Sequence, residues 1–303
     1  MRVDPYFTST LTTSLNNVQA TQQQLASQLS SGVRVNNLSD DPAAAGQNVM
    51  LLNSIQKDDT FTQTATSVKG QLQVADTALG SIVTELTSAI QLATAGSNGT
   101  TNANNVQSIS NQLTGIRSEV ESLANTNYQG KYVFAGTSDS TVPFSTSSTT
   151  SPAVTTYNGD SSVNYVETPN GMKIQTNLPG DQLFLGNGKN SVFGALNNLI
   201  ADFSSGTVDS NKAVTDTAAL NTALNYVSQQ RVTLDDSINQ LTSASDAATS
   251  EKTQLTTAQT NLMQADVAQI STQLSLSETQ QTALESVIAQ LNSATNSLFS
   301  KLS

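Results

Sequence analysis

The chain of 303 residues contains no cysteine, no histidine and no tryptophan. Without cysteine it can form no disulfide, and without cysteine and histidine the usual zinc and transition-metal ligand sets are missing. Every catalytic triad that uses a histidine base is missing as well. We therefore predict no metal site, no cofactor and no catalytic residue.

Charge is scarce too, because only 12% of the residues are charged, about half of the usual fraction. A net charge of −11 with only 12 Lys and Arg argues against binding to nucleic acid or to anionic lipid. The N-terminus lacks the features of a signal peptide, and no apolar run approaches the roughly 18 residues of a membrane span. We predict no nucleic-acid or membrane partner, and either a cytoplasmic protein or export without a cleaved signal.

Both ends of the chain instead carry apolar seams with alternating steps of four and three residues, which is the spacing of helices that pack on other helices. The C-terminal seam consists of Ile270, Leu274, Ser277, Gln281, Leu284, Ile288, Leu291, Thr295, Leu298 and Leu302, and the N-terminal seam of Leu11, Leu15, Val18, Gln22, Leu25 and Leu29. This pattern predicts a hairpin of terminal helices with the rest of the chain inserted between them.

We take the apolar members of the two seams as the candidate assembly interface. They are Leu11, Leu15, Val18, Leu25, Leu29, Ile270, Leu274, Leu284, Ile288, Leu291, Leu298 and Leu302. Their large side chains are too few to offset the ordering of the C-terminal helix, so we predict that neighbouring subunits complete this layer.

Residues 5–33 contain no charged side chain. Ser, Thr and Asn each cost a helix roughly 0.5 kcal/mol relative to Ala, and no ion pair compensates. We therefore predict that residues 1 to about 40 and 264–303 are disordered in the free monomer and become helical when they pack.

A helix stop and a helix start follow the N-terminal seam. Gly32 fits the position just after a helix, while Asp41 fits an N-cap and Pro42 a first helical residue. A long helix is expected from Pro42, a break at Gly96, and an antiparallel neighbouring helix over 106–123. The helical pattern returns from about Thr217, and its phase slips by one residue at 263–266, which predicts local unwinding and a domain boundary.

Residues 128–203 hold 9 of the 14 aromatic residues and differ in character from the helical regions. Alternating apolar residues on either side of 168–171 predict a β-hairpin with its turn at Asn170 and Gly171. Residues 138–156 are rich in Ser and Thr, which predicts a mobile surface loop whose hydroxyls could also accept glycans.

The predicted fold is mainly α with an inserted β-rich domain, in a nested arrangement. Residues 1–40 plus 264–303 would form a terminal coiled-coil layer. Residues 41–127 plus 206–263 would form an antiparallel helical bundle, and residues 128–205 a small β-rich outer domain.

Several segments resemble the bacterial flagellin superfamily. The N-terminal signature lies in 29–44, with Gly32, Arg34, Asp40, Asp41 and Pro42 among its residues. Residues 129–137, 265–268 and 297–299 agree with it. The resemblance covers residues 1–136 and 217–303. The sequence of the signature segments is more similar to the hook-associated proteins at the hook–filament junction than to flagellin.

This resemblance implies a flagellin-like nested architecture and a structural role outside the cell. Terminal helices of such proteins pack into the inner tube of an axial filament after type III export. Implied partners are further copies in a ring, a neighbouring hook-associated protein, flagellin, and an export chaperone at the C-terminal helix. The alternative function within the superfamily is flagellin itself.

Three candidate sites have simpler structural explanations. Asp40 and Asp41 could be an acid/base or metal pair, but neighbours at a helix start do not converge on one substrate atom. Residues 186–189 partly resemble the phosphate-binding loop motif, but Asn190 stands where that motif has Ser or Thr. Residues 98–100 match a glycosylation sequon.

An enzyme carried in residues 128–203 is the third functional hypothesis, after the junction protein and flagellin. Nothing in that region assembles a nucleophile, a base and an oxyanion donor.

Overall fold

The structure is a computed structural model that describes residues 5–97, 102–186 and 191–300. Its side chains are described in these ranges except at Pro5, Thr8 and 294–300. The chain divides into two compact units: a terminal unit of Met1–Gln56 with Glu251–Ser303, and a central unit of Lys57–Ser250. Helices α2 and α5 contribute residues to both units.

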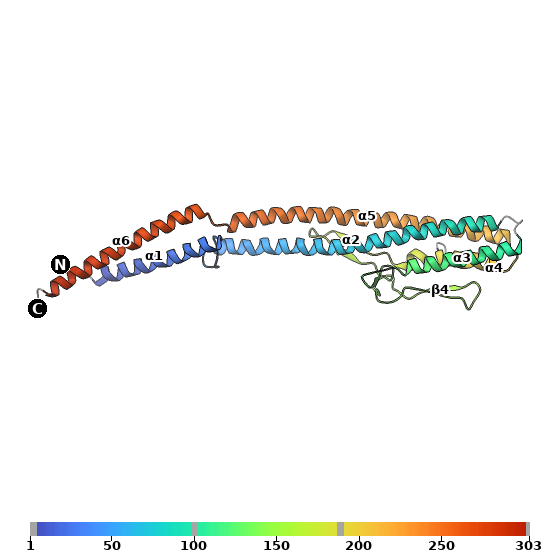
Figure 1. Cartoon of the computed structure of the whole chain (residues 1–303), viewed down its shortest axis with the longest axis horizontal. Coiled ribbons are helices and arrows are strands. Elements are labelled where there is room, and N and C mark those ends of the chain that lie inside the picture. Colours follow the sequence, from blue (N-terminus) through green and yellow to red (C-terminus); the bar gives the residue numbers. More distant parts are fainter. Residues whose placement is uncertain (1–4, 98–101, 187–190, 301–303) are drawn as a thin grey trace. The chain divides into compact units, whose positions relative to one another are not determined.

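The described residues form six α-helices, one π-helical turn and three two-stranded antiparallel sheets (Figure 1). The helices are α1 (Pro5–Ser31), α2 (Pro42–Gly96), α3 (Ala103–Ala124), α4 (Val192–Ser204), α5 (Ser210–Met263) and α6 (Val267–Ser300). The strands are β1 (Asn127–Tyr128), β2 (Lys131–Tyr132), β3 (Phe144–Ser147), β4 (Val154–Tyr157), β5 (Tyr165–Glu167) and β6 (Lys173–Gln175), and the π-helical turn is η1 (Asp181–Leu185). The prediction of a mainly α fold with small β elements is confirmed.

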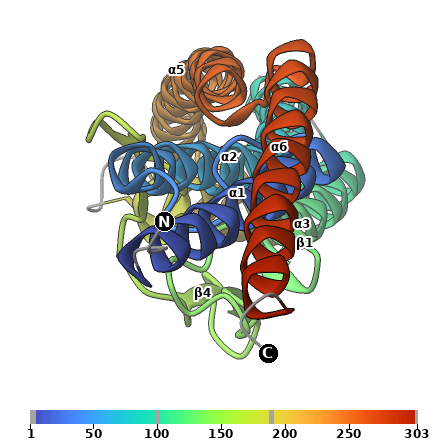
Figure 2. The same ribbon diagram turned by 90° about the vertical axis from the view of Figure 1, so that its left-hand side faces the viewer.

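In the terminal unit, α1 and α6 lie side by side, as both views show (Figures 1 and 2). They run antiparallel, because Val33 pairs with Gln264 at one end, Leu25 shares a cluster with Ile270, and Val18 shares a groove with Ser277 further along. The predicted hairpin of terminal helices is therefore present within one chain.

The central unit is built around one continuous apolar core. The helical seam predicted in α2 is buried, and Leu79, Ile82 and Leu86 are all fully inaccessible to solvent. Gly96 of α2 lies against Ile109 of α3, and residues further back in α2 share a groove with residues further along α3. The two helices are thus antiparallel neighbours, as predicted.

The aromatic residues of 128–203 enter the same core. Phe134, Phe144, Phe184 and Phe193 are buried and make ring contacts at centroid distances of 5.3 to 6.1 Å. Offset and edge-on ring contacts of this kind add stability beyond the burial of apolar area. The core of the insert and that of the helices are continuous.

Residues 192–204 correct the prediction of a purely β-rich insert, because they form helix α4. The Ser191 side chain accepts a hydrogen bond from the Gly194 backbone N–H and caps the helix. Its apolar residues recur at helical spacing, with Phe193, Leu196 and Phe203 fully buried. Both the cap and the spacing are local sequence signals of a helix.

Residues 138–156 also differ from the prediction of a surface loop, because β3 and β4 form a hairpin over residues 144–157. Phe144 pairs with Tyr157 and Ser147 with Val154. The Thr146 and Thr155 hydroxyls lie 2.7 Å apart across the strands. A cross-strand threonine pair therefore helps to stabilise a segment that composition alone suggested to be irregular.

The predicted hairpin around 168–171 is confirmed by β5 and β6, but its turn lies one residue earlier. The Gly171 backbone N–H donates to the Thr168 carbonyl over 2.9 Å, so Pro169 and Asn170 are the central residues. Gly171 follows with φ of +85°, which glycine adopts without strain. The turn is a three-residue type closed by a glycine bulge.

Candidate assembly interface

The described side chains of the two seams are buried to different degrees. Leu25 and Ile270 are buried, and Leu11, Leu15, Val18, Leu274, Leu284, Ile288 and Leu291 are half-buried. Leu29 is 37% exposed. Leu298 lies in α6 but its side chain is outside the described part, and Leu302 lies outside the described residues. The hairpin alone therefore leaves most of the seam partly open to solvent.

Two seam positions carry buried polar atoms with no hydrogen-bond partner among the described residues: the Gln22 Nε2 and the Ser277 Oγ. Polar groups at seam positions weaken a helix pair but restrict its register. An unsatisfied buried group costs about 1 to 3 kcal/mol. The terminal hairpin is accordingly a weak core by itself.

The signature residues form the turn that connects α1 to α2. Gly32 ends α1 with φ of +67°, and its N–H donates to the Gln28 carbonyl over 2.9 Å. The left-handed conformation explains why glycine stands at this position. The predicted helix stop at Gly32 is confirmed.

Asp41 and Pro42 start α2 as predicted. The Asp41 Oδ1 accepts a hydrogen bond of 3.0 Å from the Ala44 backbone N–H. This bond and the Arg34 guanidinium, which lies 3.1 Å from the Asp41 Oδ2, hold the pKa of Asp41 below its ordinary value. Asp41 therefore acts as an N-cap.

Asp40 has a different backbone partner. Its Oδ2 accepts hydrogen bonds from the Asn36 and Asn37 backbone N–H groups at 3.1 and 2.9 Å. Because each of the two neighbouring carboxylates is held by its own backbone segment, their arrangement supports structural roles for both.

Arg34 links this turn to the break between α5 and α6. Its backbone N–H donates to the Met263 carbonyl over 2.7 Å, and its Nη2 donates to the Leu262 carbonyl over 3.3 Å. The Ala265 N–H donates in turn to the Gly32 carbonyl over 3.0 Å. These hydrogen bonds from the signature turn thus fix the position of the end of α1 relative to the start of α6.

The break itself lies at 264–266, where the sequence predicted local unwinding. The Asp266 Oδ1 accepts hydrogen bonds of 3.0 Å from both the Ala268 and the Gln269 backbone N–H groups, so it caps α6. The phase slip of the seam therefore appears as a helix end followed by a new start.

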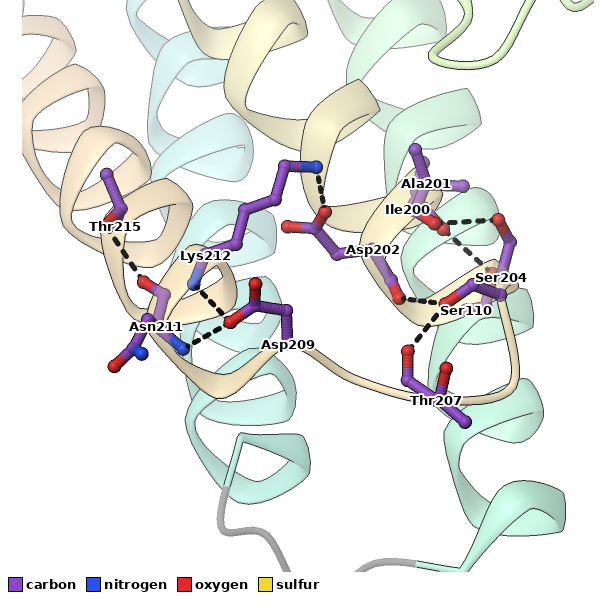
Figure 3. A network of polar contacts seen from close by, with 11 residues as sticks. Ser110, Ile200, Ala201, Asp202, Ser204, Thr207, Asp209, Asn211, Lys212 and Thr215 are labelled. Carbon is purple, nitrogen blue, oxygen red and sulfur yellow. Dashed lines mark hydrogen bonds and ion pairs between the residues drawn. The ribbon is translucent and has the colours of Figure 1, made fainter.

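A buried polar network in the central unit was not found from the sequence. Figure 3 shows Lys212 at the start of α5 reaching the Asp202 carboxylate at the end of α4. Asp202 and Asp216 each keep a buried carboxylate oxygen without a hydrogen-bond donor among the described residues. Desolvation and the neighbouring Asp202 raise the pKa of Asp216.

A second missed interaction joins α2 to α5. The Arg231 Nε lies 2.8 Å from the Asp76 Oδ1, and its Nη2 lies 3.2 Å from the Asp76 Oδ2. Arg231 occupies a position of the apolar repeat in α5, and the two-pronged ion pair explains how it fits there. Gly80 leaves room for the guanidinium, since a Cβ there would lie 3.4 Å from the Arg231 Cζ.

The motif at 129–137 has a structural explanation. Gln129 and Gly130 have φ of +53° and +82° and form the tight turn between β1 and β2. Gly136 has φ of +70°, and a Cβ there would lie 2.0 Å from the Asp160 carbonyl oxygen. Thr137 and Ser138 donate hydrogen bonds to the Asp160 carboxylate. The bonds from Thr137, the largest contribution, and from Ser162 hold the pKa of Asp160 well below its ordinary value.

Other candidate sites gain no support. Residues 187–190 and 98–100 lie outside the described residues. Within the described ranges, no group of three or more His, Cys, Asp or Glu side chains could hold a metal ion. None of the helices, as far as they are described, is long and apolar enough to cross a membrane.

Comparison with known proteins gives matches in both sequence and structure. The family described as bacterial flagellin N-terminal helical region matches residues 6–139. Flagellar hook-associated protein 3 of Escherichia coli (strain K12) is 33% identical over 132 residues, which are 43% of this chain and 42% of that protein. The matched stretch thus spans less than half the length of this curated relative.

Two solved structures share the fold over most of their length. A flagellar hook-associated protein from Vibrio parahaemolyticus has a TM-score of 0.66 and 22% identity, with 74% of this chain and all of that chain covered. Flagellar hook-associated protein 3 from Legionella pneumophila has a TM-score of 0.60 and 14% identity, with 72% and 98% covered. Residues 6–139 therefore match the bacterial flagellin N-terminal helical region, and the chain shares its fold with these two hook-associated proteins over about three quarters of its length.

Proposed function

We propose that this chain is a non-enzymatic structural subunit of the bacterial flagellum that joins the hook to the filament. The relatives named above supply the role, since they are hook-associated proteins. The observation that supports assembly through the terminal helices is the incomplete burial of the seam between α1 and α6. A seam that one hairpin covers only in part gains stability when neighbouring helices cover the remainder.

The distribution of exposed apolar side chains supports the same conclusion. Ten large ones lie in the described part of the terminal unit: Tyr6, Phe7, Leu29, Leu38, Val49, Met50, Leu52, Val267, Leu276 and Val287. Six lie in the larger central unit: Val142, Val154, Tyr165, Met172, Val214 and Val232. Surfaces rich in exposed apolar groups favour contacts with other subunits.

In this proposal the copies form a ring through repeated heterologous contacts of their terminal helices. The ring would meet a hook-associated protein on one side and flagellin on the other. The protein would be exported by the flagellar type III apparatus, with a chaperone bound to α6 beforehand, and would act outside the cell. A charge-free α1 that folds only on packing is compatible with passage through a narrow export channel.

Deletion of the gene tests the junction role. We expect cells that keep their hooks, lose their filaments and release flagellin into the medium, with filaments restored by the full-length gene. Motile deletion cells with normal filaments would refute the proposal.

Flagellin itself is the alternative, because the matched family covers the N-terminal helices of flagellins by name. Purified protein that grows into long filaments on seeds would favour flagellin. Protein that stays monomeric under those conditions, while purified flagellin polymerises, would favour the junction role.

A further inference from the structure

Two carboxyl groups meet at the corner where α4 ends and α5 begins. Lys212 of α5 contacts the Asp202 Oδ1 of α4 (Figure 3). Asp216 follows Lys212 by four residues, so it lies one turn further along the same face of α5. The side chains of Asp202 and Asp216 are within hydrogen-bonding reach of each other. We call these two residues the carboxyl pair.

Each member of the carboxyl pair keeps one buried oxygen without a hydrogen-bond donor among the described residues. These atoms are the Asp202 Oδ2 and the Asp216 Oδ2. Asp202 as a whole is only 7% exposed. Buried polar atoms in native structures nearly always have a partner, and two ionised carboxylates in contact repel each other. Two ionised groups therefore fit this corner poorly.

A single proton between the two groups removes both difficulties. A protonated carboxyl group is a hydrogen-bond donor, so it can donate to the facing carboxylate. The same bond then satisfies both buried oxygens. It also leaves the carboxyl pair with one negative charge in place of two, and the Lys212 ammonium balances that charge.

The surroundings make Asp216 the donor and Asp202 the acceptor. Lys212 contacts Asp202 directly, and a cation stabilises the ionised form of the carboxyl group that it touches. Desolvation and the neighbouring Asp202 raise the pKa of Asp216 above its ordinary value. Lys212 and Asn198 act in the opposite direction, but their contributions are smaller.

The neighbouring elements add polar and apolar contacts around the carboxyl pair. Asp209 is engaged as the cap at the start of α5. Ser110 of α3 donates to the Ile200 carbonyl of α4 over 3.3 Å. Gly96 of α2 lies against the Phe203 ring. The contacts from α2 and α3 are thus uncharged.

The elements packed further back on α4 are engaged elsewhere. Thr155 of β4 accepts a hydrogen bond from the Asn197 side chain, and the Asp181 carboxylate of η1 accepts one from Ser161. A metal ion suits the corner less well than a proton, because the Lys212 ammonium already lies on one side of the pair. Within the described ranges, no group of three or more His, Cys, Asp or Glu side chains could hold a metal ion.

We propose that Asp202 and Asp216 share one proton and form a pH-sensitive contact between α4 and α5. The proton bridges the two helices at low pH, and the bridge is lost as the pH rises through the pKa of the pair. Above that pH, two neighbouring negative charges loosen the corner. The inference goes beyond the proposed function and does not depend on it, because the corner lies within the central unit.

NMR on the purified full-length protein, labelled with ¹³C at the aspartate carboxyl groups, tests the shared proton. The resonances of the carboxyl pair are assigned by their loss in Asp202→Asn and Asp216→Asn. We expect both to respond at one common pH midpoint above 3.8, the ordinary value for aspartate. A response of the Asp216 resonance alone, or a midpoint at or below 3.8, would overturn the proposal.

Removal of the acceptor separates the effect of the pair from that of burial. Lys212→Gln serves as the background, because Lys212 could otherwise turn to Asp216 once Asp202 is replaced. In this background Asp202→Asn should shift the midpoint of Asp216 down toward its ordinary value. Asp236→Asn removes an exposed carboxylate from the same helix and should leave the midpoint unchanged. An unchanged midpoint after Asp202→Asn would show that burial alone raises it, which contradicts the proposal.

Hydrogen exchange tests whether the shared proton holds the corner together. After correction for the intrinsic effect of pH on exchange, amides at the end of α4 should lose protection several-fold as the pH rises through the midpoint. In Asp216→Asn the side-chain amide can donate to Asp202 at any pH, so protection should stay constant. Constant protection in the wild type, or an equal loss in both proteins, speaks against a pH-sensitive contact.

Discussion

The central and terminal units carry the same kind of helical repeat, yet they bury it to different degrees. In the central unit the repeat of α2 is sealed, with Leu79, Ile82 and Leu86 fully buried. Among the described side chains of the apolar seam in the terminal unit, only those of Leu25 and Ile270 are buried. Several helices and the aromatic insert surround the first repeat, whereas two helices alone face each other in the second. A heptad pattern therefore predicts that a helix packs, but not how completely its own chain covers it.

Hydrogen exchange on the free monomer should show the largest difference between the two units. We expect backbone amides in the buried part of α2 to exchange orders of magnitude more slowly than those of α1 and α6. The reason is that the weak terminal hairpin opens, or stays unfolded, until it packs on other subunits. Strong protection of α1 and α6 in the monomer would show that the hairpin is stable by itself.

A matched pair of leucine substitutions measures the same difference in packing. Leu86→Ala removes a fully buried side chain from α2 and should lower the free energy of unfolding by about 3 kcal/mol. Leu15→Ala removes a half-buried one from α1 and should cost the monomer about 1 kcal/mol or less. Chemical denaturation of the purified monomers gives both values. If assembly uses the terminal helices, Leu15→Ala should nonetheless be the more harmful change in flagella.

Gly136→Ala tests how rigid the insert of the central unit is. The new Cβ would lie 2.0 Å from the Asp160 carbonyl oxygen, and the backbone conformation at φ of +70° disfavours a side chain. We expect a loss of about 3 kcal/mol in the free energy of unfolding. Gly115→Ala is the control, because no atom lies within 4 Å of its added Cβ and alanine should stabilise the helix by about 1 kcal/mol. Equal effects of the two substitutions would contradict this prediction.

The two units can also be compared through the coupling energy of one ion pair in each, where a smaller difference is expected. A double-mutant cycle on Asp76 and Arg231 in the central unit should give a coupling energy of about 1 kcal/mol, because the pair is half-buried and two-pronged. The same cycle on Arg34 and Asp41 in the terminal unit should give a coupling near zero in the monomer, where the pair is more exposed. Thermal unfolding at low and high salt measures both couplings. A larger coupling for the terminal pair would indicate a folded signature turn in the free chain.

The smallest expected effect concerns pH and the Asp202, Asp216 and Lys212 network. The pKa of Asp216 is raised above its ordinary value of 3.8, so the folded state disfavours its ionised form. This cost is present above the folded pKa and disappears as the pH falls through it. Asp216→Asn should therefore raise the Tm by a few degrees at neutral pH, with the gain shrinking on acidification. Asp236→Asn, an exposed change on the same helix, should leave the Tm nearly constant.

Local sequence signals predicted much of the helical fold. Gly32, Asp41 and Pro42 marked the boundary between α1 and α2 because each acts on the backbone within a few residues of its own position. The phase slip at 263–266 coincides with the helix break, since it depends only on residue spacing. The region of helix α4 is rich in aromatic residues, which favour strands, whereas Ser191 and the apolar spacing favour a helix, and the helix is what forms.

The candidate site was predictable only in part. The seams identified which faces of α1 and α6 pack, but not the exposed flank with Leu276 or the unsatisfied Ser277 hydroxyl. Both depend on how two helices far apart in the sequence are offset along each other. The contact between Asp76 and Arg231 was likewise not predictable from the sequence, because its partners are separated by 155 positions.

The sequence by itself therefore determined the helical periods, the caps, the charge-free N-terminus and the resemblance to a flagellar family. These features depend on neighbouring residues and on composition. Tertiary structure alone decided that the repeat of α2 is fully buried while the terminal seam stays partly exposed. It also decided which carbonyl groups Arg34 binds and that a groove lies beside Ser277. Such features depend on distances between elements that are remote in the chain, and local propensity carries no information about those distances.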